Sequence, residues 1–119
     1  MKLCILIVLM LLPQIAFAQE KFKISGAGVL SCGKFLEQAD NSYAKDLHIQ
    51  WAQGFLSGLN AGAQIEGAEM VSLPDAESIW AYLTNYCRQS PLKTPFSGNL
   101  ALYKELQERS RASAARERP

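Results

Sequence analysis

The chain has 119 residues, which is enough for one domain with a modest hydrophobic core. Its 12 lysines and arginines are nearly balanced by 11 aspartates and glutamates, and the sequence contains a single histidine. Because domains that bind nucleic acids usually carry a clear excess of basic residues, this balance argues against a nucleic-acid partner.

Residues 1–18 have the pattern of a cleavable signal peptide. Lys2 supplies a basic residue, an apolar run extends from Ile5 to Leu12, and Ala16 and Ala18 form an A-x-A exit. This run is too short to cross a bilayer, and no later segment approaches the roughly 18 apolar residues that a membrane span requires. We therefore expect cleavage near Ala18, a periplasmic or secreted protein, and no stable membrane anchor.

Cleavage after Ala18 would remove Cys4 and leave Cys32 and Cys87. An even pair of cysteines in an exported protein predicts a disulfide bond. The alternative is two free thiols or half of a metal site, but one histidine and no neighbouring cysteines make a metal site a poor explanation. The bridge would close a loop containing most of the domain, which corresponds to roughly 4 kcal/mol in the chain-entropy account.

The first half of the exported chain predicts an irregular segment followed by two helices. Residues 19–30 mix charged residues with glycines and are expected to be irregular. Ser31 then opens a short helix, because the following apolar residues fall on one helix face. These residues are Cys32, Phe35, Leu36 and Ala39. Residues 40–42 form a turn with a candidate N-cap for the next helix.

The second predicted helix extends from Ala44 to about Gln64 and is the strongest element. Its expected inner face repeats every fourth residue: Leu47, Trp51, Phe55, Leu59 and Ala63. Its opposite, polar face contains Gln50, Gln53, Ser57, Asn60 and Gln64. Gly54, Gly58 and Gly62 also recur every fourth residue, although each glycine inside a helix costs about 1 kcal/mol relative to alanine. We interpret them as the place where a neighbouring helix approaches closely.

The second half of the chain predicts two further helices and a tail. After a connection at residues 67–71, Pro74 and Asp75 mark a helix start. Its expected inner face is Ala76, Ile79, Trp80, Leu83 and Cys87. Pro91 ends this helix, and Thr94 with Pro95 starts a last one. The expected inner face of that last helix is Phe96, Leu100, Tyr103 and Leu106. Residues 109–119 are expected to form a flexible basic tail.

These elements predict an all-α fold, a small four-helix orthogonal bundle spanning residues 31–108. The disulfide would link the first helix to the third around the glycine-lined second helix. No pattern of catalytic, metal-binding or nucleotide-binding residues stands out, so neither an enzyme nor a cofactor is expected.

Four residues are candidates for a functional role. His48 lies on the apolar side of its helix, where it is either a packing residue or a candidate pH sensor. Trp51, Trp80 and Tyr82 are candidate partner contacts, and the alternative for both tryptophans is a place in the core.

Four segments carry a resemblance to a known family. They are Ser31-Cys32-Gly33-Lys34-Phe35-Leu36, Trp51-Ala52-Gln53-Gly54-Phe55-Leu56-Ser57-Gly58, Leu73-Pro74-Asp75 and Tyr86-Cys87-Arg88-Gln89-Ser90-Pro91. Together they resemble the HdeA/HdeB-like superfamily of small bacterial periplasmic proteins, over roughly Gly26 to Leu106. That group includes acid-stress chaperones, immunity proteins against peptidoglycan-cleaving effectors, and members with no assigned activity. The resemblance implies an all-helical fold with a single disulfide.

Two functions follow as hypotheses. The first is an interaction protein that recognises one protein partner, as an immunity-type inhibitor of a secreted effector does. The second is an acid-stress chaperone that binds unfolded clients. In strong acid the 11 carboxylates are protonated, and repulsion among the remaining positive charges would loosen the bundle and expose its apolar faces. Either function suits a monomer or a homodimer.

Overall fold

The computed structural model describes residues 24–118, in which four α-helices and one short 3-10 helix occur and no strand. They are η2 (Ala27–Val29), α2 (Cys32–Glu37), α3 (Ser42–Ile65), α4 (Ala76–Gln89) and α5 (Pro95–Arg116). The predicted all-α class is confirmed. The predicted signal peptide at residues 1–18 lies outside the described residues. No helix in the described range is both long and apolar enough to cross a membrane.

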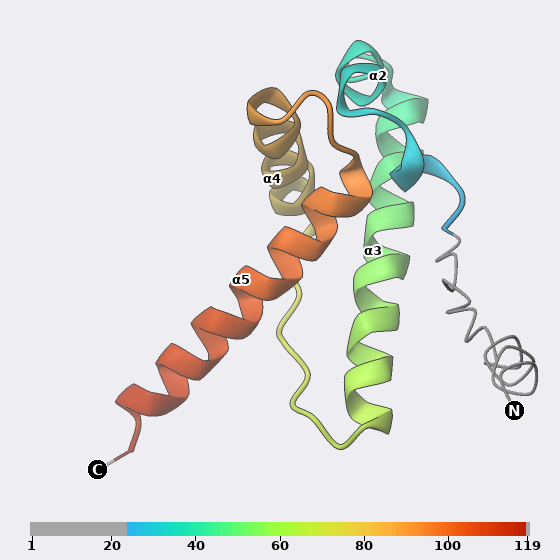
Figure 1. Ribbon diagram of the computed structural model, residues 1–119. Helices are drawn as coiled ribbons and strands as arrows, with labels where there is room; N and C mark the ends of the chain where they lie inside the picture. Colours follow the sequence, from blue (N-terminus) through green and yellow to red (C-terminus); the bar gives the residue numbers. More distant parts are fainter. Residues whose placement is uncertain (1–23, 119) are drawn as a thin grey trace, which may run out of the picture.

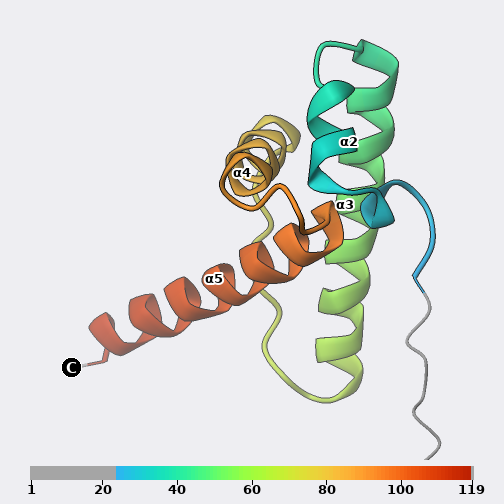
Figure 2. The ribbon, with the colours of Figure 1, turned by 45° about the horizontal axis from the view of Figure 1, so that its top comes forward.

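The long helix α3 is the axis of the arrangement (Figure 1). The helices α2 and α4 lie beside its N-terminal half, and α5 starts near α3 and then leaves it at a steep angle (Figure 2). The connection at residues 66–75 returns from the C-terminal end of α3 to the start of α4, running between α3 and α5 (Figure 1). The N-terminal segment with η2 lies against α3 and the start of α5.

Each α-helix begins at a side-chain cap, which explains why the helix starts were predictable. Ser31 Oγ accepts a hydrogen bond from Lys34 N at 3.2 Å, and Asn41 Oδ1 accepts one from Ala44 N at 3.0 Å. The caps of the last two helices are Asp75, which accepts from Ser78 N, and Thr94, which accepts from Ser97 N. Pro95 occupies the first turn of α5 as expected, whereas Pro74 lies before the cap of α4 and not in its first turn.

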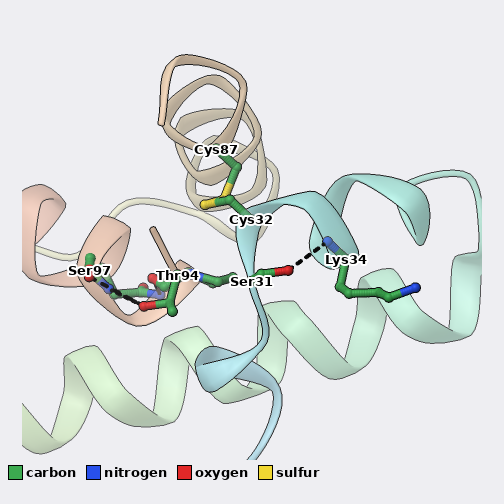
Figure 3. Close-up of a disulfide and its surroundings, with 8 residues drawn as sticks. Ser31, Cys32, Lys34, Cys87, Thr94 and Ser97 are labelled. Atoms are coloured by element: carbon green, nitrogen blue, oxygen red, sulfur yellow. Dashed lines mark hydrogen bonds between the residues drawn. A yellow bond between two sulfur atoms is a disulfide. The ribbon is translucent and has the colours of Figure 1, made fainter. Parts of the chain in front are cut away.

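The core is centred on the predicted disulfide, which links α2 to α4 (Figure 3). The Cα atoms of Cys32 and Cys87 are 4.8 Å apart, and both residues are fully buried. Around the bridge the core is completed by side chains from α2, α3, α4 and α5. The most deeply buried of these are Phe35, Ala52, Leu56, Ile79 and Leu83.

The predicted inner face of α3 is wrong for Leu47 and right in part, since Leu59 packs against the core. The buried residues of this helix are His48, Ile49, Ala52 and Leu56, whereas Leu47 is 48% exposed. Two apolar rows run along α3, and α2 and α4 pack against the row that carries the small side chain of Ala52. In the other row Trp51 and Phe55 are half-buried, and Trp51 is covered by the N-terminal segment that contains η2.

The predicted role of the α3 glycines is also wrong. A Cβ atom added to Gly54, Gly58 or Gly62 would meet nothing within 4 Å. The close approach of two helices occurs at Gly98 of α5, where a Cβ atom would lie 2.9 Å from Leu83 and 3.0 Å from Tyr86 of α4. The pattern of glycines in α3 therefore does not mark a helix contact within the described chain.

Asn60 joins α3 to two other parts of the chain, although the sequence placed it on the solvent-facing side. Its side-chain amide donates to Val71 O at 2.8 Å, and its Oδ1 accepts from Val71 N at 3.0 Å. The same Oδ1 accepts from the hydroxyl of Tyr103 in α5 at 3.0 Å. One polar side chain thus fixes the connection from α3 to α4 and also binds α5.

The last helix differs from its prediction in two respects. It continues to Arg116, where the sequence predicted a flexible tail from residue 109, because alanine and arginine favour helix and Arg109 pairs with Glu105 one turn earlier. Its inner face is also only partly as predicted. Tyr103 is buried and Leu106 packs against the core, as expected, whereas Leu100 is 42% exposed and Leu102 is buried instead.

Candidate functional site

An uncharged groove lies between the N-terminal segment and the start of α3. Its volume is about 440 Å³. One wall is formed by Gly26, Ala27 and Leu30, and the other side by Gln38, Asn41, Tyr43, Ala44, Leu47 and His48. None of these side chains is an acid, a lysine or an arginine. Tyr43 is 72% exposed and Leu47 is 48% exposed, so this groove presents apolar surface to solvent.

Trp51 holds the N-terminal wall of the groove in place. Its Nε1 donates to Ser25 O at 2.9 Å, and its ring lies so close to Gly28 that a Cβ there would be 2.1 Å from it. Gly26 has a φ of 94°, a left-handed conformation that favours glycine. The wall can therefore lie on the indole only because both positions are glycine. Trp51 is a candidate partner contact that the structure places behind the wall of the groove.

An aromatic series continues from Trp51 along the same side of α3. The Trp51 ring stacks on Phe55 with a centroid distance of 5.2 Å, and Phe55 meets Phe96 of α5 edge to face at 5.3 Å. This series links the N-terminal segment, α3 and α5, so a change at Trp51 is expected to move the groove wall.

His48 lies at the inner side of the groove and is only 4% exposed. Its Nε2 donates to Gln38 Oε1 at 3.1 Å, and its ring packs edge to face on Phe35 of α2 at 4.8 Å. Burial lowers the pKa of His48 below its ordinary value, because the apolar surroundings disfavour the charged ring. His48 is therefore both part of the groove and a buried titratable group, and its role as a pH sensor stays a prediction.

The other two candidate contacts lie elsewhere. Trp80 packs on Phe35 at 4.9 Å and has Lys45 Nζ 5.7 Å from its ring, while Lys45 also pairs with Glu77 at 2.8 Å. Tyr82 borders a separate hollow of about 230 Å³ between α4 and α5. Burial, with a smaller contribution from the carboxylate of Glu105, raises the pKa of the Tyr82 hydroxyl. The structure thus does not bring the predicted contact residues together.

The rim of the groove was not found from the sequence. Tyr43 lay just before the predicted start of the helix and carried no signal, and Leu47 was assigned to the core. Only the packing of the N-terminal segment beside α3 reveals that both border one surface. Within the described residues, no group of three or more histidine, cysteine, aspartate or glutamate side chains is placed to hold a metal ion.

Comparison with protein-family models, with curated proteins and with solved structures finds no match.

Proposed function

We propose that this protein acts by binding another protein, and that the groove beside α3 is a binding surface. The observation that carries the proposal is an uncharged groove whose rim exposes Tyr43 and Leu47. The centres of protein interfaces are depleted in charged residues and enriched in tyrosine, and contiguous exposed apolar surface commonly marks such sites.

The partner is expected to contribute an apolar side chain to this groove. A volume of about 440 Å³ is within the range of ligand-binding clefts, so it has room for one or two apolar side chains but not for a whole helix. Because no charged side chain lines it, a charged group of the partner would lose its hydration there without gaining an ion pair.

The class of partner that we propose is an effector protein encountered in the periplasm, which this protein inhibits as an immunity protein. The support is the resemblance to the HdeA/HdeB-like superfamily, together with a scaffold suited to inhibition. The hydrogen bond from Trp51 to Ser25 O and the packing of His48 on Phe35 hold the two sides of the groove in place before binding, which reduces the ordering cost at the interface.

The test is capture of a partner with the groove intact and with the groove changed. The exported chain, from Gln19, is used as bait in periplasmic extract, and bound proteins are identified by mass spectrometry. Leu47→Asp places a charge in the groove and should abolish capture. Ile65→Asp is the matched control, because Ile65 is 87% exposed at the other end of α3, and it should leave capture unchanged. No reproducible partner, or equal loss in both variants, would contradict the proposal.

A second candidate function is the acid-stress chaperone, favoured by the position of His48. Its ring is buried between Phe35 and the groove, 6.4 Å from the ring of Trp80, so protonation places a positive charge where α2, α3 and α4 meet. We expect the protein to suppress light scattering by an aggregating client at pH 2–3 and to have no effect at neutral pH. Absence of suppression at a few-fold molar excess would rule this function out.

A further inference from the structure

The connection between α4 and α5 presents one leucine almost completely to solvent. Leu92 is 97% exposed, the largest fraction among the large apolar side chains that the structure describes. A single exposed leucine is common on protein surfaces, so exposure alone implies no function. The significance of Leu92 depends on how firmly the backbone around it is held.

The backbone of residues 90–93 forms a closed turn. Lys93 N donates to Ser90 O at 3.0 Å, which places Pro91 and Leu92 at the two central positions. Proline is favoured at the first of these positions because its ring already restricts φ to the value that the turn requires. The side chain at the tip of the turn is therefore presented in a restricted set of directions.

The turn is also fixed to the core on both sides. Before it, Cys87 is bonded to Cys32, and both are fully buried. After it, Lys93 O accepts a hydrogen bond from Cys32 N at 2.8 Å, and Thr94 caps α5. Figure 3 shows the disulfide next to the start of α5, where Thr94 and Ser97 are hydrogen-bonded. The most exposed leucine that the structure describes is thus carried by a connection that is anchored on both sides.

In the stretch of sequence that carries Leu92, the charge has one sign. Arg88 precedes it and Lys93 follows it, both are exposed, and Lys93 Nζ lies 5.9 Å from the centroid of the Tyr86 ring. No aspartate or glutamate occurs from residue 88 to residue 104. A partner that accepts the leucine would therefore be favoured by acidic side chains around its apolar pocket.

We propose that the turn Ser90–Lys93 is an interaction surface separate from the groove, in which Leu92 inserts into an apolar pocket with an acidic rim on a partner protein. Because the turn is ordered before binding, the partner does not bear the cost of ordering it. A lone leucine beside two cations buries too little apolar surface to anchor a protein to a membrane, so a protein partner is favoured over a lipid surface. The proposal shares with the proposed function the premises of a protein partner and of a periplasmic location.

The test uses three variants of the full chain, each produced separately in the periplasm and each carrying one photo-cross-linking amino acid. The amino acid stands at position 92 in the turn, at position 47 in the groove, or at position 65 as an exposed control. We expect one discrete protein adduct at position 92 and none at position 65. An adduct at position 47 without one at position 92 would contradict the proposal that the turn is an interaction surface. It would still support the groove as a binding surface. An adduct at 92 alone supports the turn and contradicts the groove. No adduct at either position contradicts both.

The protein cross-linked at position 92 is then purified and its affinity measured. Leu92→Ala should weaken binding about 10- to 100-fold, whereas Ile65→Ala should change it less than about twofold. Lys93→Glu should weaken binding and flatten its salt dependence. Thermal unfolding should be unchanged in Leu92→Ala, since the side chain contacts solvent. Equal affinities for Leu92→Ala and the unmodified chain overturn the proposal. If the protein sediments with anionic phospholipid vesicles and Leu92→Ala does not, the turn binds lipid. That result would also contradict the proposal of a protein partner.

Discussion

The two ends of the molecule are held together by different means. At one end α2, α4 and the first halves of α3 and α5 bury the disulfide together with Phe35 and Ile79. At the other end the last turns of α3 and α5 diverge (Figure 2). There the connection from α3 to α4 is fixed by the hydrogen bonds of Asn60, and Val71 of that connection reaches the same core. The groove and the Leu92 turn both lie at the disulfide end. The comparison shows that the surfaces we propose for binding are carried by the packed end of the molecule.

The largest expected effect is loss of the disulfide. Replacing both cysteines, Cys32→Ser with Cys87→Ser, removes a cross-link between positions 55 residues apart. We expect the free energy of unfolding in urea to fall by about 4 kcal/mol. Reduction of the unmodified protein should give the same curve as the double variant. A decrease below about 0.5 kcal/mol would mean that the bridge contributes nothing to the packed end.

The next largest effect concerns the end of the molecule away from the disulfide, where α3 and α5 diverge. Asn60→Leu keeps the size of the side chain but leaves both backbone groups of Val71 without their partner, and we expect a loss of about 1–3 kcal/mol. Hydrogen exchange at the Val71 amide should accelerate, whereas amides near the disulfide should not change. Gln64→Leu, at an exposed position one turn later in α3, is the control and should stay within about 0.5 kcal/mol. Equal effects of the two variants would contradict this role of Asn60.

Replacing either of two glycines by alanine should change the stability of the fold, but in opposite directions at the two positions. In Gly28→Ala the new methyl group overlaps the Trp51 ring, and we expect a loss of about 1–3 kcal/mol in thermal or urea unfolding. In Gly58→Ala the methyl group points into open space and alanine favours the helix, so stability should rise by up to about 1 kcal/mol. If the free energy of unfolding of monomeric Gly58→Ala decreased instead, the finding that nothing lies near this position of α3 would be contradicted.

The smallest effect is the pH dependence from His48. Burial lowers its pKa in the folded state, so the unfolded chain takes up a proton first as pH falls below about 6.5. Stability should be full above that pH and decrease below it, with a slope of at most about 1.4 kcal/mol per pH unit. Urea unfolding between pH 7.5 and 5.5 measures the slope, and NMR titration of the ring gives the direction of the shift. His48→Gln should remove this dependence, and a slope that persists in the variant would assign it to other groups.

Most helix starts and the cysteine pair were predictable because their causes are local or few. The caps Ser31, Asp75 and Thr94 each bond to a backbone amide three residues later, so a short window of sequence contains the whole interaction. The pairing of Cys32 with Cys87 followed from the absence of another cysteine after the predicted leader. The four-helix architecture follows from these signals together with the spacing of apolar residues.

The candidate site was predicted only in part. His48 was singled out and does lie at the groove, but Tyr43, Leu47 and Leu92 were not proposed as surface features. An apolar residue on a helix is expected to be inside unless the neighbouring element is known. For Leu47 that element is the N-terminal segment, which contacts α3 but leaves this side chain at the rim.

By itself the sequence determined the helical class, most of the helix starts and the covalent bridge, since each depends on contacts within one turn or on a unique pair. Only the tertiary structure decided which side of α3 is buried. Both of its apolar rows satisfy the helical period, and the choice between them depends on the shape of the helices that pack there. The same holds for Gly28, whose importance is set by a tryptophan from a different element. Packing between distant segments, which no local pattern encodes, therefore determined the surfaces through which we propose that this protein acts.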